Sequence, residues 1–581
     1  MLFSHINPLD LVEKKTSVYI YFFCVAFLFA QCTEKKDLEL SIDATQARSL
    51  QEHSSEFEKN ILKIGDNIYV AIGFGLANSI MIVGDDGRII VDCMESEKSA
   101  TAVKAKFDSI SNLPIKALVY THFHPDHTFG ADIFAEDESP AVIAHETTSD
   151  ELDKLVNIRR PITQARSFRM FGNFLNDEEL INAGIGPLLN MDEELHLGAI
   201  RPNVTFSVSM DTTIAGINMQ FHHAPGETDD QLFVWLEDKK ILLAGDNIYK
   251  TFPNLYTIRG TSYRDVNQWA RSIDKMRYLQ PEIVIPSHTR PIEGADIVYE
   301  TLTIYRDAIQ FVHDQTVRNM NLGYTIDEIV EQVHLPNALA QSPYLQEFYG
   351  RVDWSVKSIF TGYMGFFDGN PATLIPSIGK EKAENMASLA GGKSELLNRA
   401  QHAFDDGNYQ WSLELTDHLL LLDVDQEQAK KIRLQCLIKL GQNHTNPNAR
   451  HYYLTCAKEL QGLKMKGSKV TGEMARNLPI EAIFANLAVN LIPEKSERVD
   501  QLMTVKFTEN DEYWSVYVRN GVAEIQNFEL PNASISVHTT ANDWKELITG
   551  VKGGLKSLAS GAVSIEEGSV LDFNEFMGMF K

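Results

Sequence analysis

The chain has 581 residues, of which 44% are hydrophobic and 23% charged, and its formal net charge is −26. This length and apolar content suffice for several hydrophobic cores, on the order of three or four domains. Such an acidic chain has nothing to attract a phosphate backbone, which excludes nucleic acid as a partner. Because the charge also opposes an anionic substrate at long range, a site for one would need positive charge of its own.

The N-terminus is typical of an export signal, with two lysines before thirteen apolar residues at 18–30. A bilayer span takes about 20 residues, so this run suits the core of a signal peptide over residues 1–32. Cys32 follows it and resembles the cysteine of a lipoprotein cleavage box, although Gln31 is off pattern. The alternatives are ordinary cleavage near Ala30 or an uncleaved anchor. We therefore expect a periplasmic or secreted protein, with lipidation of Cys32 as a route to a membrane tether.

Short strands dominate the next region. Residues 36–60 are polar and charged with helical character and form a lead-in segment. Glycines then separate the apolar runs 68–71, 79–83 and 89–92, a pattern that predicts hairpin strands. A further buried strand is expected at 115–120, directly before the most informative residues of the chain.

The six-residue segment 122–127, which follows this strand, contains three histidines and an aspartate. His122 and His124 can lean the same way from the strand end, whereas Asp126 and His127 follow a turn that Pro125 helps to fix. These two pairs of ligands suit two adjacent metal ions. Because ligand sites in layered α/β folds lie where buried strands end, we expect the metals at that edge.

The pattern His-x-His-x-Asp-His resembles that of the metallo-β-lactamase superfamily, whose fold is an α/β structure of the αββα type holding one or two metals, usually zinc. The resemblance implies three further ligands that each follow a turn or an apolar strand: Glu227, Asp246 and His288. His222 and His223 are rival candidates for the position given to Glu227. The implied arrangement has one ion on His122, His124 and Glu227, another on Asp126, His127 and His288, and Asp246 as the bridge.

A carboxylate at the position of Glu227 resembles the secreted alkyl sulfatases within this superfamily. Long strings at 254–260 and 365–371 are also similar to that family. The family has Thr-Glu after the Pro-Gly turn, and Ala-Glu-Asn where this chain has Gly245-Asp246-Asn247, so the match is inexact at both places. The resemblance covers roughly residues 60–581 and implies a zinc-dependent alkyl sulfatase, an enzyme of detergent degradation.

The resemblance also implies roles for the residues around the metals. Two zinc ions per chain, bridged by Asp246, would lower the pKa of a shared water and give the hydroxide that hydrolyses an alkyl sulfate ester to alcohol and inorganic sulfate. Arg259, helped by Asn254, would hold the sulfate oxygens. Asp126, Arg259 and Tyr349 are the catalytic candidates. A salt bridge for Arg259 and a core position for Tyr349 remain open.

Two other functions remain open. One is a lactonase or β-lactamase-type hydrolase on the same dinuclear scaffold. The other is a lipid-binding or assembly protein with a vestigial metal site, which the complete set of ligand candidates disfavours.

Three domains are expected after the signal. The metallo-β-lactamase-like domain spans 61–296, and apolar residues at helical spacing predict an all-helical domain over 297–465. A tetratricopeptide-type hairpin from Leu396 to Gly441 cannot bury its own apolar face, so it must pack on neighbours or a second subunit. The sulfatase resemblance implies that this domain forms a homodimer, and the alternative is that it caps the catalytic domain.

The last domain, at 466–581, is expected to be α+β. Three strands and a broken helix are predicted: 502–507, 514–518, 533–537 and 544–558 with a break at Gly553-Gly554. It resembles the sterol carrier protein type 2 fold, which offers an apolar groove for an alkyl chain. An ordinary core is the alternative.

Overall fold

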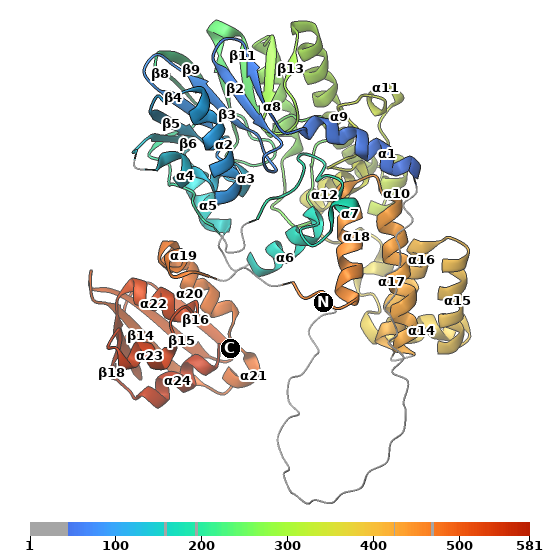
Figure 1. Cartoon of the computed structure of the whole chain (residues 1–581). Helices are drawn as coiled ribbons and strands as arrows, with labels where there is room; N and C mark the ends of the chain where they lie inside the picture. The colour runs from blue at the N-terminus through green and yellow to red at the C-terminus, as the bar shows by residue number, and fades with distance from the viewer. Residues whose placement is uncertain are drawn as a thin grey trace, which may run out of the picture. The chain divides into compact units, whose positions relative to one another are not determined.

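The computed structural model of the protein describes residues 44–580, except 137, 156–159, 192–195, 423–424 and 466–469 (Figure 1). The expected signal at 1–32, Cys32 and the first part of the lead-in segment lie outside the described residues. Within these described ranges, no helix combines the length and the apolar character that a membrane span requires.

Two sheets form a sandwich in the first half of the chain. The first has seven strands in sequence order: β1 (Asn60–Ile64), β2 (Ile68–Ile72), β3 (Ser79–Val83), β4 (Arg88–Val91), β5 (Ile115–Val119), β6 (Ala141–His145) and β7 (Val204–Phe206). The second has six strands in the order β13-β12-β11-β10-β9-β8. Its strands are β8 (Ser209–Ile214), β9 (Ile217–His223), β10 (Leu232–Leu236), β11 (Ile241–Gly245), β12 (Ile283–Pro286) and β13 (Ile292–Glu293). The strands expected at 68–71, 79–83, 89–92 and 115–120 are therefore present.

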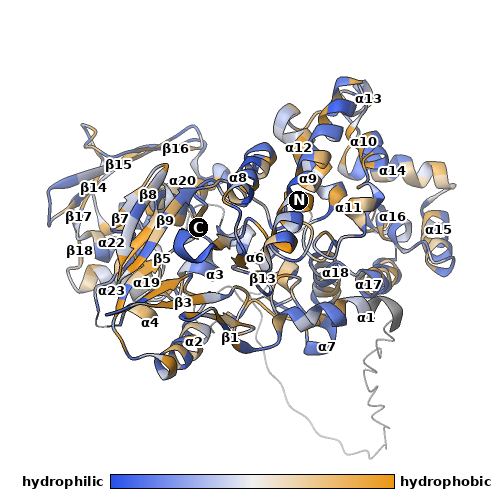
Figure 2. Cartoon of the chain, turned by 90° about the horizontal axis from the view of Figure 1, so that it is seen from above, coloured by the Kyte–Doolittle hydropathy of each residue, from blue (hydrophilic) through white to orange (hydrophobic). Residues whose placement is uncertain are grey.

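Apolar side chains fill the space between the sheets. Val70, Ile82 and Val119 of the first sheet join Phe221 and Leu243 of the second in one buried cluster. Hydrophobic residues dominate many of these strands (Figure 2), as expected where both faces of a sheet are covered.

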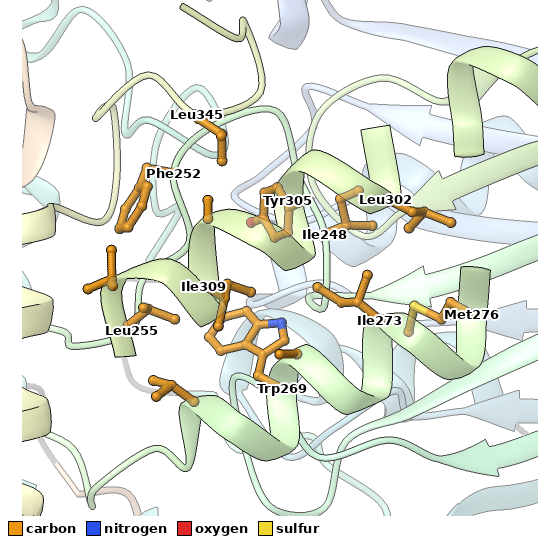
Figure 3. Packing of buried hydrophobic residues seen from close by; sticks show 14 of the residues in the cluster. Ile248, Phe252, Leu255, Trp269, Ile273, Met276, Leu302, Tyr305, Ile309 and Leu345 are labelled. Atoms are coloured by element: carbon orange, nitrogen blue, oxygen red, sulfur yellow. The ribbon is translucent and has the colours of Figure 1, made fainter. Parts of the chain in front are cut away.

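Helices cover the outer face of each sheet. On the first sheet, α2 (Glu97–Ile110) and α4 (Ala131–Ala135) contribute Phe107 and Phe134 to a buried cluster. On the second sheet, α8 (Val266–Tyr278) packs Trp269 against residues of α9 (Ala295–Asn321), as Figure 3 shows. The order of layers is helix, sheet, sheet, helix.

An all-helical region follows the sandwich. Its helices are α10 (Ile326–Gln332), α11 (Asn337–Ala340), α12 (Val352–Met364), α13 (Pro371–Leu374), α14 (Gly379–Ala390), α15 (Lys393–Asp405), α16 (Tyr409–Leu421), α17 (Gln426–Asn443) and α18 (Pro447–Leu460). The segment predicted as one hairpin, 396–441, contains three helices: most of α15, α16 and most of α17. Ala383 of α14 and Ala457 of α18 share a buried cluster with Leu396 and Leu419 of this segment. The expectation that the hairpin packs on neighbours is confirmed within the chain.

The C-terminal region is an α+β module. Its five-stranded sheet has the order β16-β15-β14-β17-β18. The strands are β14 (Asp500–Phe507), β15 (Glu512–Arg519), β16 (Val522–Gln526), β17 (Ile535–Thr539) and β18 (Val563–Glu567). The helices are α19 (Gly472–Asn477), α20 (Ile480–Val489), α21 (Pro493–Ser496), α22 (Ala541–Ile548), α23 (Gly554–Ala559) and α24 (Val570–Gly578). The predicted helix break lies between α22 and α23, and the apolar groove stays a prediction.

The described part of the lead-in segment is helical, as expected, and comprises α1 (Ala44–His53) and the short helix η1 (Ser54–Phe57). His53 Nε2 lies 2.7 Å from the carbonyl oxygen of Gly184, and its ring stacks on Phe348. These contacts fix the segment to two loops, whose neighbouring residues Ile185 and Tyr349 line the cavity described below.

One helix of the all-helical region supports two helices that follow β6. These are α6 (Arg160–Phe171) and α7 (Asp177–Leu180). His451 of α18 is buried between them, with Nδ1 3.2 Å from the carbonyl of Met170 and Nε2 2.8 Å from that of Leu180. Burial lowers the pKa of His451 to about 4, so this imidazole is neutral in the fold at ordinary pH.

This buried histidine predicts a loss of stability in acid. Between pH 6.5 and about 4 the unfolded chain binds a proton on His451 that the folded chain does not. The stabilisation is complete above pH 6.5 and is lost as the pH falls through that window, by at most about 3 kcal/mol. We expect His451→Gln to reduce the difference between the melting temperatures at pH 7.5 and pH 4.5. The exposed His402→Gln is the control, and equal differences for both variants would contradict this assignment.

Candidate metal centre

The predicted metal motif begins where β5 ends. After His122, a single helical turn, α3 (Pro125–Thr128), begins with Pro125 as its first residue and His124 as its N-cap. The backbone N–H of Phe129 donates to the carbonyl of Pro125 at 3.0 Å and closes this turn. His122 and His124 therefore precede the turn, as expected. Asp126 and His127 lie within it and not after it, which corrects the expectation from the sequence.

The structure brings six of the predicted ligands into two buried groups. The groups are His122, His124 and Asp246, and Asp126, His127 and His288, and within each the ligand atoms lie within 4.8 Å of one another. Asp246 Oδ2 also lies 3.1 Å from His288 Nε2 and 3.5 Å from His127 Nε2. Asp246 thus faces both groups, which is the position required of a bridging ligand.

The chemistry of these groups fits metal ions. His127 Nε2 and Asp246 Oδ1 are buried atoms without a hydrogen-bond partner. Burial lowers the pKa of both His122 and His124, which favours the neutral imidazole that binds metals. Burial alone would raise the pKa of Asp126, but the adjacent His127 and His288 lower it to about 2. These side chains therefore offer ionised carboxylates beside imidazole nitrogens.

At the end of β11, a residue with left-handed backbone conformation directs the chain towards the metal centre. Gly245 has φ +59°, a conformation that disfavours residues with a side chain. A Cβ atom there would lie 2.9 Å from the Gln231 amide and 3.0 Å from Thr121 Cβ. Glycine thus permits the close approach that places Asp246 beside the motif after β5.

Asp92 anchors the metal motif, and sequence reasoning did not single it out. Its Oδ2 accepts hydrogen bonds from His127 Nδ1 at 2.8 Å and from Ser287 Oγ at 2.6 Å. Its Oδ1 accepts from the backbone N–H of Thr121 at 2.9 Å. His127 is thereby held with Nε2 towards the site, and His288 is held likewise through Nδ1, 2.9 Å from the carbonyl of Leu76. Carboxylates and carbonyls in these positions fix the tautomer of a metal-binding histidine.

Glu227 lies in the same cavity but outside the two groups. Its Oε1 lies 3.0 Å from Arg264 Nη2, and its Oε2 accepts from the Tyr249 hydroxyl at 3.2 Å. Burial raises the pKa of Glu227, although Arg264 opposes the shift. Its role as a ligand stays a prediction. The buried pairing of Glu227 with Arg264 became visible only in the structure.

The rival histidines lie on β9 and belong to neither group. His222 stacks on Phe233 with ring centroids 4.9 Å apart. His223 stacks on His145 at 3.8 Å, and its Nε2 lies 2.7 Å from the carbonyl of Asp229. Their contacts are those of strand residues packed on their neighbours.

Two of the three residues expected to bind sulfate or act in catalysis beside the metals line the cavity. Arg259 Nη2 lies 3.1 Å from His124 Nε2, and Arg259 makes no salt bridge with any residue that the structure describes. Tyr349 also lines the cavity and packs edge-on against Tyr249. Asn254 is buried with both amide atoms unpartnered, but it is not part of the cavity wall. The roles of these residues stay predictions.

The cavity combines a polar end with apolar walls. It encloses about 1010 Å³ between its walls, part of it open to solvent. At one end lie the polar residues His124, Asp126, Glu227, Asp246 and Arg259. The apolar walls comprise Leu76, Phe129, Phe168, Phe171, Ile185, Leu189, Met191 and Leu197. Such a cavity suits an amphiphile with a small charged head and an alkyl chain.

One wall residue, Glu95, was not predicted. Its Oε1 accepts from the backbone N–H groups of Leu76 and Asn190, and its buried Oε2 has no partner. Burial raises the pKa of Glu95 to about 8. A lone glutamate has no spacing pattern that could have revealed this position.

Three family models match the chain in succession. They describe the metallo-beta-lactamase superfamily (residues 72–288), alkyl sulfatase dimerisation (325–462) and the alkyl sulfatase C-terminal domain (468–581). A linear primary-alkylsulfatase from Pseudomonas sp. is 38% identical over 523 residues, which cover 86% of this chain and 98% of that protein. The chain belongs to the alkyl sulfatase family.

Other alkyl sulfatases are similar over most of their length. An (R)-specific secondary-alkylsulfatase from Pseudomonas sp. is 27% identical, covering 89% of this chain and 80% of that protein. An alkyl/aryl-sulfatase from Saccharomyces cerevisiae is 26% identical, covering 90% of this chain and 82% of that protein. The structure of the stereoselective inverting sec-alkylsulfatase Pisa1 from Pseudomonas sp. matches with a TM-score of 0.80 and 25% identity, covering 90% of this chain and 84% of that one. The expected αββα sandwich, helical domain and C-terminal domain are confirmed.

The contacts of Asp92 predict that it controls metal affinity. In Asp92→Ala, His127 loses the acceptor that holds its ring, so we expect metal affinity to fall about 10- to 100-fold. Metal content per chain after dialysis against a weak chelator measures this effect. Asp86→Ala, which removes an exposed carboxylate, is the matched control. If Asp92→Ala retained the same metal content as the control, the anchoring role would be wrong.

Proposed function

We propose that this alkyl sulfatase hydrolyses linear alkyl sulfate esters to an alcohol and inorganic sulfate. The observation that carries the proposal is the cavity, which joins long apolar walls to two groups of buried histidines and carboxylates and to Arg259. An alkyl chain fits the apolar walls, and a sulfate head fits the polar end. The names of the relatives support the same chemistry and disfavour the lactonase or β-lactamase alternative.

We propose two zinc ions per chain, one on each group of ligands, with Asp246 between them. Imidazole and carboxylate donors suit zinc, and both donor types are present in each group. When bound, the ions would supply Lewis-acid stabilisation of a sulfate oxygen and an activated water nucleophile.

The remaining chemistry belongs to side chains of the protein. Arg259 offers a planar fork of donors at the polar end of the cavity, which suits two oxygens of one sulfate group. Tyr349 lines the same cavity. The apolar walls hold the chain of the ester and keep water from the polar end, which strengthens each electrostatic contact there.

A panel of substrates tests this function. We expect the purified enzyme to release sulfate from dodecyl sulfate below its micellar concentration much faster than it opens lactones or β-lactams. Removal of metal with a strong chelator should abolish turnover, and zinc should restore it. Faster hydrolysis of lactones or β-lactams than of every alkyl sulfate would overturn the proposal.

Arg259 should matter for turnover but not for metal binding. Loss of a charge-assisted pair of hydrogen bonds at a developing anion costs about 2 to 4 kcal/mol, which corresponds to roughly 1.5 to 3 decades in rate. We expect Arg259→Ala to lose that much kcat/KM for dodecyl sulfate with unchanged metal content. Arg259→Lys should recover only part of it, because lysine restores the charge without the fork. Near-normal activity of the alanine variant would show that sulfate is held elsewhere.

We also propose that the helical domain forms a homodimer. The match to a model named for alkyl sulfatase dimerisation supports this, as do large apolar side chains exposed around α13 and α14. Phe366 is 89% exposed and Ile375 is 90% exposed, a level that is costly for a free monomer in water. Sedimentation equilibrium tests this proposal: we expect wild type to be a dimer and Ile375→Glu, which places a charge on the exposed apolar surface, to dimerise more weakly. A monomeric wild type would contradict the proposal.

A further inference from the structure

A second, more polar cavity adjoins the one described above. The two share part of their walls, including His124, Arg160, Thr163 and Arg259. The second cavity adds Arg166 and the hydroxyl residues Thr261 and Ser262. We name it the anion chamber, defined by Arg160, Thr163, Arg166, Arg259, Thr261 and Ser262.

Arg160 is the most informative residue of the anion chamber. It is the first residue of α6, is partly buried, and lines both cavities. It makes no hydrogen bond or ion pair with any residue within the described ranges, and burial lowers its pKa. A guanidinium group has five donors, so a partly buried one without partners favours an anion as its ligand.

Arg166 adds a second source of positive charge. Its Nη2 donates to the carbonyl of Ile258 at 2.5 Å, next to Arg259 in the chain, and its buried Nε has no partner. The acidic side chain in the wall is Glu151, which is already paired with Lys154. The chamber is therefore locally positive in a chain of net charge −26. Because the chain as a whole is acidic, these arginines do not serve to attract anions from a distance. Their position in one cavity wall favours an anion bound there.

The proposed reaction creates an anion that needs such a place. Hydrolysis converts the ester monoanion and one water into an alcohol, sulfate dianion and a proton, so the sulfate product has one more negative charge than the ester. The alcohol can remain against the apolar walls. The dianion cannot enter those walls without losing its hydration. It can leave by the side on which Arg160 and Arg166 lie.

We propose that the anion chamber is a second sulfate subsite, which takes the inorganic sulfate product from the polar end of the first cavity and holds it through Arg160. This inference rests on the proposed function, because it is the hydrolysis of a sulfate ester that supplies the ligand. The subsite separates the exit of sulfate from that of the alcohol.

Product inhibition tests the subsite. Inhibition of dodecyl sulfate hydrolysis by added sodium sulfate is measured at constant ionic strength, with sodium chloride as the balance. We expect Arg160→Gln to raise the inhibition constant of sulfate about tenfold, the value of one charge-assisted hydrogen bond. Inhibition by dodecanol should not change. Arg160→Lys should restore part of the sulfate affinity, and Arg399→Gln, which replaces a surface arginine of α15, should match wild type.

The outcomes separate the product from the incoming ester. If Arg160→Gln lowers kcat/KM for dodecyl sulfate but leaves the sulfate inhibition constant unchanged, the chamber handles the ester head group and the inference is wrong. It is also wrong if Arg160→Gln equals the Arg399→Gln control in every constant. Melting temperature and metal content equal to wild type show that Arg160→Gln is folded.

A direct measurement does not depend on turnover. Selenate, a tetrahedral dianion with an anomalous X-ray signal, is soaked into crystals of wild type and Arg160→Gln. We expect a site within hydrogen-bonding distance of Arg160 in wild type and its loss in the variant. Selenate only at Arg259 would overturn the inference. Absence of dodecyl sulfate hydrolysis by wild type would instead overturn the proposed function, whatever selenate binds.

Discussion

The site depends on the hydrogen bonds that the carboxylate of Asp92 accepts. It follows β4 and binds Thr121, which follows β5, and Ser287, which follows β12, so one side chain joins strand ends from both sheets. The same carboxylate orients His127. Burying an ionised group is costly unless hydrogen bonds satisfy it, and here four donors do so. Asp92 therefore stabilises the edge of the sandwich and also sets the geometry of the metal centre.

The sequence predicted the part of the site whose ligands lie close together or follow a recognisable strand. His122 to His127 have a spacing that few other functions require, and Asp246 and His288 each follow an apolar run. Asp92 and Arg160 have no such context. Each is a single charged residue whose role arises only when segments far apart in the chain meet. Glu227, Asp246 and His288 were all named by resemblance, and the structure pairs Glu227 with Arg264.

The fold was predictable where burial imposes a strong pattern. Strands such as β2, β3 and β11 are nearly continuous apolar runs, and the helices after the sandwich have apolar residues at regular spacing. β16 and β18 were not predicted, because most of their residues are only partly buried or exposed and alternate weakly. The walls of the cavity were not predicted either, since they combine α6 with loop residues such as Ile185 and Leu197.

Because α18 supports α6, substrate range in this family can change through residues outside the sandwich. α6 provides Phe168 and Phe171 to the apolar wall, and α18 holds it through His451 and through an ion pair between Arg169 and Glu459. A helix of the all-helical region thus fixes the shape of a cavity in the sandwich. Mutational libraries confined to the sandwich would include the wall residues but leave out His451 and Glu459, which hold α6 in place. An excised sandwich would keep its ligands without the scaffold behind the alkyl chain.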